Sequence, residues 1–323
     1  VLDSKGASAT LPCFCCSNVT GLTKQKAKPK AKAKAKPKSK ANVKPPQTLK
    51  AKPAANIQDA PVVTGLASHD PTGTLVLITE LDKSKFIPHT DASILEVVRY
   101  LEREHETSTS VGKFKLTQQV LGLNYCPNGL LMCERLQRVY KPITTYMFDW
   151  MHVYLVTGIF QHEAGLLLDR LKKKANISHP ELHDFFSDFI WPANQNCGKK
   201  VFEKRSEAQN GTRKKDLKCA ASDGLGSYCL LRMYFDICSV PDKHPELKEA
   251  CESFARLCDV LDLLQNIARG SVSHLMLEDA ILAHLEACKQ AYGQSFWFPK
   301  MHHCLHLPDM LANHGLLISC FVH

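Results

Sequence analysis

No run of apolar residues in this chain approaches the roughly 20 that a membrane-spanning helix needs, so we expect neither a transmembrane segment nor a membrane partner. Stretches typical of β-strands are scarce, and neither an initiator methionine nor a signal peptide opens the chain. Because the chain also stops directly after an apolar run, we expect a fragment cut at both ends. Without a secretory signal, its fourteen cysteines are expected to be reduced thiols in a cytosolic or nuclear compartment.

Acidic residues are absent between Lys24 and Lys52, where twelve lysines stand mostly among alanines and prolines. The whole chain carries a net charge of only +9, so the remainder is mildly acidic. Like charges repel and nothing apolar is available to bury, which predicts a disordered arm over residues 23–55. The arm resembles the tail of linker histones. It is suited to phosphate binding by counterion release or to nuclear import, and the plain alternative is a solvated linker.

DNA is therefore the expected partner and the nucleus the expected location. A second basic stretch lies in the polar segment 194–218, which we expect to be a loop. Contacts to phosphates carry no sequence information, so no target sequence follows from these residues. The basic side chains expected to contact nucleic acid are Lys24, Lys26, Lys28, Lys30, Lys32, Lys34, Lys36, Lys38, Lys40, Lys199, Lys200, Arg213, Lys214 and Lys215.

From residue 91 onward, apolar residues recur at helical spacing, and the expected fold class is mainly α. Thr90 and Asp91 are expected to begin the first helix. A buried strand is expected over 74–78. Helices are predicted over 91–105, 116–121, 149–171, 180–190, 222–234, 245–268 and 273–292.

The stretch Phe148-Asp149-Trp150-Met151-His152 stands at the head of the predicted central helix. Asp149 suits the N-terminal position, where its carboxylate accepts free backbone N–H groups. His152 follows three residues later and lies on roughly the same face. A carboxylate and an imidazole on one face are typical of an active site, although a capping aspartate beside a buried histidine is also a common structural arrangement.

Two short spacings suggest metal ligands. Cys13 and Cys16 form a CxxC, which is half of a zinc site, but no second half follows at the spacing of a zinc knuckle. His302 and His306, four apart on a helix, have the spacing to face one metal ion. No HExxH pattern accompanies them, and their apolar neighbours favour core histidines. No cysteine stands in a recognisable nucleophile context, which disfavours a Cys–His hydrolase.

The Phe148–His152 stretch, followed by a glycine-containing amphipathic helix, resembles the Asp-x-Met-His segment of CACTA-type (En/Spm) DNA transposases. Two more regions resemble the family in the same order. Ser222-Asp223, after a basic loop, is similar to a Ser-His-Asp segment that opens a later helix, with Ala221-Ser222 in place of Ser-His. Residues 257–261, 298–302, 306–308 and Gly315 resemble the following helical domain, with its Phe-Pro-Pro, His-Leu and Gly-Pro-Val landmarks. The family also carries a CxxC just after the strands of its core.

The resemblance implies an RNase-H-like core, interrupted and followed by helical domains. On that basis residues 1–22 are expected to end the catalytic-core region, and 23–55 are the arm. Residues 56–155 form an α-rich segment with a short strand, leading to the Asp-x-Met-His motif. Residues 156–323 form a helical domain. The chain would then be a partial RNase-H-like core with an inserted and a C-terminal helical domain.

The chemistry implied by the resemblance is DNA cleavage and strand transfer at two Mg²⁺ ions held by three carboxylates. Asp149 and His152 would lie beside that centre. Asp223 is the candidate third acid, with an ordinary helix N-cap as its alternative. No stretch before residue 13 supplies the other two acids, so we expect the chain to be catalytically silent alone. The competing hypothesis is a non-catalytic DNA-binding or chromatin protein that joins a basic arm to a helical interaction domain.

Overall fold

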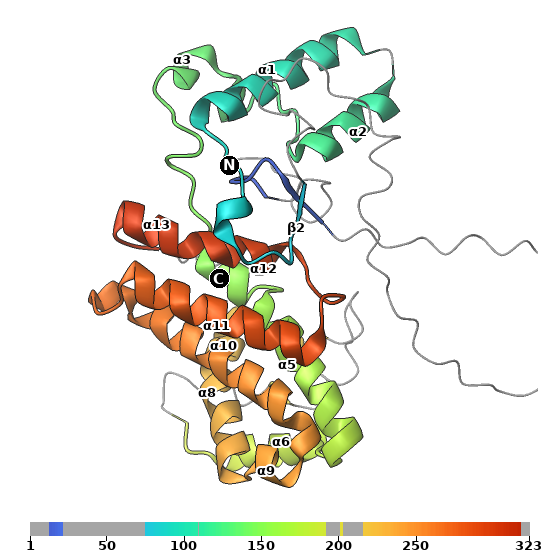
Figure 1. The fold of residues 1–323 in the computed structure, drawn as a ribbon, viewed down its shortest axis with the longest axis vertical. Helices are drawn as coiled ribbons and strands as arrows, with labels where there is room; N and C mark the ends of the chain where they lie inside the picture. Colours follow the sequence, from blue (N-terminus) through green and yellow to red (C-terminus); the bar gives the residue numbers. More distant parts are fainter. Residues whose placement is uncertain (1–12, 22–74, 109, 192–200, 203–215, 318–323) are drawn as a thin grey trace, which may run out of the picture.

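The computed structural model describes residues 13–21, 75–108, 110–191, 201–202 and 216–317. These residues are mainly helical, as predicted. Within these ranges, every helix is too short or too polar to cross a membrane. The basic residues predicted to contact nucleic acid, at 24–40, 199–200 and 213–215, lie outside the described residues. Figure 1 shows an elongated molecule with a small helical unit at one end and a large helical body at the other.

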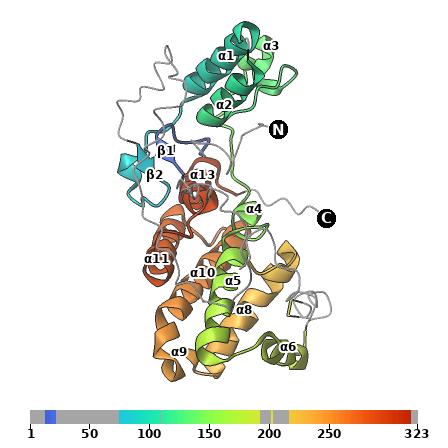
Figure 2. The ribbon, with the colours of Figure 1, turned by 90° about the vertical axis from the view of Figure 1, so that its right-hand side faces the viewer.

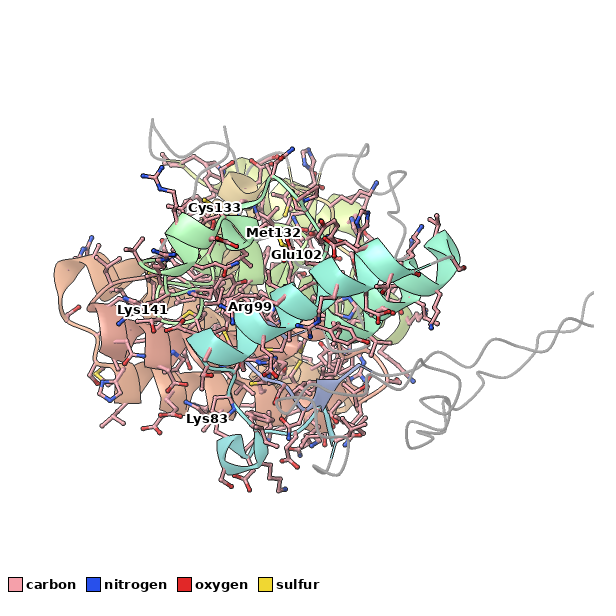
Figure 3. The ribbon with its side chains drawn as sticks, turned by 90° about the horizontal axis from the view of Figure 1, so that it is seen from above. Lys83, Arg99, Glu102, Met132, Cys133 and Lys141 are labelled. Carbon is pink, nitrogen blue, oxygen red and sulfur yellow. The ribbon has the colours of Figure 1, made fainter. Side chains whose placement is uncertain are left out.

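The small helical unit comprises α1 (Asp91–Thr107), α2 (Val111–Leu121), η5 (Leu130–Met132) and α3 (Glu134–Gln137). Thr90 caps α1 as predicted, because its side chain accepts the backbone N–H of Ser93. Helix α2 begins earlier than predicted, since Ser110 caps it through the N–H of Lys113. Figure 3 looks down on this unit, with α1 running diagonally across the front of the view. The unit has its own apolar core, formed by Phe14, Ile94, Val97, Val98, Leu101, Leu121 and Leu123.

A two-stranded parallel sheet lies between the small unit and the C-terminal helices (Figures 1 and 2). Its strands are β1 (Val19–Thr20) and β2 (Val76–Leu77), so the predicted strand at 74–78 is confirmed at its centre. The chain then turns through η4 (Lys83–Lys85). Within the described ranges these are the only named strands, and the RNase-H-like core therefore stays a prediction.

The large helical body packs around the pair α10 (Lys248–Asn266) and α11 (His274–Tyr292), which a short connection joins. Both helices begin and end within a few residues of their predicted bounds. Figure 2 shows α5, α8 and α10 side by side within this body, with α6 and α9 at its far end. The remaining elements of the body are α4 (Trp150–Tyr154), α5 (Ile159–Arg170), η6 (Leu171–Ala175), α6 (His179–Asp188), α8 (Ala221–Ile237), α9 (Val240–Lys243), η8 (Pro245–Leu247), η9 (Ile267–Arg269), α12 (Pro299–His303), η10 (Cys304–His306) and α13 (Leu307–His314).

The continuous central helix predicted over 149–171 is wrong, because the chain breaks between α4 and α5. Thr157 adopts a left-handed conformation with φ 45°. A Cβ at Gly158 would lie 2.3 Å from the carbonyl carbon of Tyr154, so only glycine fits this turn. The amino group of Lys300 donates hydrogen bonds to the freed carbonyls of His152 and Val156. A distant lysine therefore stabilises a break that the apolar periodicity conceals.

Candidate metal centre

The segment that contains the N-terminal CxxC makes backbone hydrogen bonds to the chain at His89 on one side and to β2 on the other. The N–H of His89 donates to the carbonyl of Cys15 at 2.8 Å, and Val76 N–H donates to Asn18 on the other side at 2.9 Å. Cys13 and Cys16 are buried in the core of the large body. Phe14, between them, points instead into the core of the small unit. The turn therefore joins two cores and directs both thiols toward the C-terminal helices.

His302 and His306 come from the helical turn formed by α12 and η10. Pro299 at the first helical position starts this turn, and the spacing of four places both rings on one side. His302 is completely buried and meets the edge of Phe86, with ring centres 4.8 Å apart. His306 stacks against Phe148, with ring centres 5.9 Å apart.

The two half-sites meet. Nε2 of His306 lies 3.3 Å from Sγ of Cys13, 3.4 Å from Sγ of Cys16 and 3.2 Å from Nε2 of His302. All four ligand atoms lie within 4.8 Å of one another. A tetrahedral Zn²⁺ with Zn–N of about 2.0–2.1 Å and Zn–S of about 2.3 Å requires ligand–ligand distances of roughly 3.3–3.8 Å. The cluster therefore fits a Cys₂His₂ zinc site.

The donor set also fits zinc chemically, because thiolate sulfur and imidazole nitrogen are the ligands of structural zinc sites. Burial opposes ionisation of Cys13, but hydrogen bonds from Cys15 and Cys16, with the charges of His306 and His302, lower its pKa well below the usual value. Hydrogen bonding to Cys13 and burial raise the pKa values of the Cys15 and Cys16 thiols. Cys13 is therefore the first thiol of the three to ionise, and the thiolate is the form that binds metal. Four protein ligands complete a tetrahedron, which is the arrangement of a structural site.

This assembly bears on two interpretations of the sequence. His302 is a buried core histidine, as its apolar neighbours indicate, and the structure also brings His302 and His306 together with the CxxC in a cluster that could hold a metal ion. Cys13 and Cys16 were predicted as half of a zinc site, and their second half lies at the opposite end of the described chain. The signals were present as CxxC and HxxxH, but a separation of 293 residues between Cys13 and His306 hid their connection.

Asp149 begins α4, as predicted, and accepts the backbone N–H groups of Met151 and His152. Its other oxygen lies 2.7 Å from Nδ1 of His152, so the predicted carboxylate–imidazole pair is present. The Asp149 side chain is 17% exposed and that of His152 is 43% exposed. The pair therefore lies at the surface of the large body, where it combines helix capping with an accessible imidazole.

Asp223 is not the N-cap of its helix, contrary to its structural alternative. Ala220 takes that position, and the carboxylate of Asp223 reaches back to accept the N–H of Ala220 at 3.3 Å. Gly224 packs against Phe160 and Leu155, which places this end of α8 near the break between α4 and α5. Within the described part of the chain, neither Asp149 nor Asp223 belongs to a group of three or more potential metal ligands. Asp149 and Asp223 as magnesium ligands therefore stay a prediction.

A cleft of about 770 Å³ opens beside the metal centre. Cys16 and His306 reach its wall from the metal cluster, and Lys83 lies there between Glu278 and Asp309, at 2.9 and 2.7 Å. Figure 3 labels Lys83 below the small unit. One side of the metal centre, at Cys16 and His306, therefore borders this cleft.

Comparison of this chain with known protein families, curated proteins and solved structures gave no match. None of the twelve described cysteines is paired in a disulfide.

Proposed function

We propose that this chain is the zinc-stabilised, DNA-binding part of a CACTA-type transposase that does not cleave DNA on its own. One observation carries the proposal: stretches that separately resemble that family, far apart in the sequence, converge at the metal centre. The CxxC supplies two ligands, and the 298–308 stretch supplies the other two.

The Asp-x-Met-His stretch packs against the same place. Phe148 stacks on His303 with ring centres 4.5 Å apart, and the N–H of Phe148 lies 3.1 Å from the sulfur of Met310. Lys300 donates to the carbonyl of His152 from the other side of this contact. Three of the segments on which the resemblance rests, the CxxC, the Asp-x-Met-His stretch and the 298–308 stretch, therefore pack together.

The metal centre would serve as the clamp of this unit. Zinc bound by Cys13 and Cys16 together with His302 and His306 would fasten the N-terminal segment to α12 and η10. Structural zinc contributes folding free energy directly. The lysine-rich arm follows β1 closely in sequence, and β1 lies beside this clamp. Zinc would thus fix the origin of the basic arm relative to the helical body.

Metal content tests the clamp. We expect the purified full chain to contain zinc, and Cys13→Ser to reduce the bound zinc by one equivalent. Cys133→Ser, which changes an exposed cysteine outside the cluster, is the matched control. Retention of all bound zinc by folded Cys13→Ser and His306→Gln variants would refute this centre.

DNA binding is tested by comparing the full chain with a variant in which the twelve lysines of the arm are replaced by glutamine. We expect the full chain to bind duplex DNA with a steep loss of affinity as salt rises. For each phosphate that the protein neutralises, log K falls by about 0.9 per tenfold increase in salt concentration. The substituted arm should flatten this slope. An unchanged slope would assign binding to the helical body, and absence of binding by the full chain would contradict the proposal.

A second candidate is a non-catalytic DNA-binding or chromatin protein derived from such a transposase. The observation that favours it is the arrangement of Asp149, whose oxygens already accept hydrogen bonds from α4 and contact His152. A strand-nicking assay with Mg²⁺ should give no product for this chain under either candidate. Nicking that Asp149→Ala abolishes would establish a catalytic centre within the chain and contradict its proposed silence.

A further inference from the structure

A second cluster of potential ligands lies in the middle of the large helical body, away from the cysteine–histidine centre. Glu163 projects from α5 and is completely buried. One carboxylate oxygen accepts the hydroxyl of Ser253 at 2.6 Å. The other lies 2.7 Å from Nε2 of His284 and 3.5 Å from Sγ of Cys288. Three helices, α5, α10 and α11, thus direct polar groups at one buried carboxylate.

The spacing on α11 suits metal binding. His284 and Cys288 are four residues apart, so their side chains share one face of the helix. The ligand atoms of Glu163, His284 and Cys288 all lie within 4.8 Å of one another. Carboxylate oxygen, imidazole nitrogen and thiolate sulfur are the three donor types that zinc accepts in proteins.

The charge balance of this cluster favours a cation. A carboxylate buried without a compensating positive charge is strongly destabilising. Nδ1 of His284 is buried and makes no hydrogen bond to any residue that the structure describes. A divalent cation bound by the carboxylate of Glu163 and the thiolate of Cys288 leaves the cluster neutral.

Tyr292 gives a second, independent indication. It extends the row of His284 and Cys288 by one further turn of α11, and its hydroxyl is a buried atom without a hydrogen-bond partner in the described part of the chain. Burial raises the pKa of this hydroxyl, and the charges of Glu163 and Cys288 raise it further against the opposing charge of Arg170. A buried oxygen donor therefore lies within electrostatic range of Glu163 and Cys288, with the Arg170 guanidinium over its ring.

We propose that Glu163, His284 and Cys288 bind a divalent transition-metal ion of the zinc class, in a second site distinct from the cysteine–histidine centre. The ion cross-links α5 to α11 in the core of the large body. Because Glu163, His284 and Cys288 are all completely buried, the ion enters while the chain folds and exchanges slowly afterwards. The competing arrangement is a metal-free hydrogen-bonded network neutralised by a proton.

Metal analysis of the full chain, purified as expressed without chelator, distinguishes these arrangements. We expect two equivalents of zinc per chain. The double variant Cys13→Ser, Cys16→Ser should retain one, and adding Cys288→Ser should remove it. Cys258→Ser changes another buried cysteine of the same core, outside the cluster, and should leave the metal content unchanged.

Cobalt gives a spectroscopic check on the ligands. The Cys13→Ser, Cys16→Ser variant expressed with Co²⁺ should keep a thiolate-to-cobalt absorption band, which Cys288→Ser removes and Glu163→Gln shifts. A folded double variant that contains no metal would overturn the proposal. If the double variant does not fold, the single variant Cys288→Ser decides: a fall from two equivalents to one supports the second site, and an unchanged content overturns it. A wild-type chain with one equivalent that depends on Cys288 and not on Cys13 would refute only the cysteine–histidine centre.

Discussion

Nε2 of His306 lies 3.3 Å from Sγ of Cys13, although 293 residues separate the two along the chain. This contact fastens the first described residue to the last helical turns before α13. It also brings together both cores of the molecule, because Phe14 belongs to the small unit and Cys13 to the large body. The stability of the whole arrangement is therefore expected to depend on the metal centre.

Removal of zinc should destabilise the chain. A chelator strong enough to compete for zinc should lower the melting temperature, because the ligands bind the ion only in the folded arrangement. A loss of about 3 kcal/mol corresponds to roughly 6–12 °C for a chain of this size. Differential scanning calorimetry with and without chelator measures this. His306→Gln should lose the part of the chelator effect that comes from the cysteine–histidine centre; a chelator effect of full size in that variant would contradict the assignment.

Gly158→Ala should be strongly destabilising, because the new Cβ would lie 2.3–2.6 Å from backbone atoms of Tyr154 and Val153. We expect a loss on the order of 3 kcal/mol in the free energy of unfolding, the range of backbone clashes in a packed turn. Gly270→Ala is the control: φ is also positive there, at 70°, but no atom lies within 4 Å of the Cβ. Its cost should stay near 1 kcal/mol. If urea denaturation gave equal losses of unfolding free energy for Gly158→Ala and Gly270→Ala, the turn at Gly158 would have relaxed to accept the new Cβ.

Lys300→Met should destabilise the break between α4 and α5. The methionine keeps the apolar stem but removes the donor to the carbonyls of His152 and Val156. Hydrogen bonds from a charged group contribute about 1.5–3 kcal/mol each, so the loss of both should cost roughly 3 kcal/mol or more in the free energy of unfolding. Lys85→Met, at a 53% exposed side chain paired with Glu80, should leave stability nearly unchanged. Hydrogen exchange at α4 should quicken only in the Lys300 variant.

Asp91 should make the small unit sensitive to acid. Burial opposes its ionisation, but hydrogen bonds from the side chain of Thr144 and from the backbone N–H groups of Thr144 and Ile143 outweigh it and lower the pKa of Asp91. A lowered folded pKa means that this stabilisation is complete above the unfolded value of about 3.9 and disappears as the pH falls through the folded pKa. Asp91→Asn should therefore be less stable than the parent at pH 7, by about 1 kcal/mol after solvent screening.

Melting curves followed between pH 7 and pH 2 check this prediction. The difference between Asp91→Asn and the parent should shrink below about pH 4, since the parent then loses the same charge. Ser108→Ala, at the other end of α1, is a control that should leave the pH dependence unchanged. A constant difference across the range would assign the effect to packing rather than to the carboxylate.

The sequence by itself determined the features that depend on residues within about four positions of one another. The caps at Thr90 and Asp149, the centre of β2 and the helices α10 and α11 follow from local periodicity and capping chemistry. The pairing of Asp149 with His152 is equally local, because a spacing of three places both on one face.

Only the tertiary structure decided the rest. The break before Gly158 is stabilised by Lys300, and the spacing of apolar residues in the central segment carries no information about that distant contact. The metal centre joins a CxxC to an HxxxH from the other end of the chain, and each half alone is an ordinary pattern. Glu163 was hidden inside an amphipathic helix, with only the His284–Cys288 spacing as a sequence signal. A ligand set forms when folding brings distant side chains within a few ångströms, and that distance is a property of the packed chain, not of its order of residues.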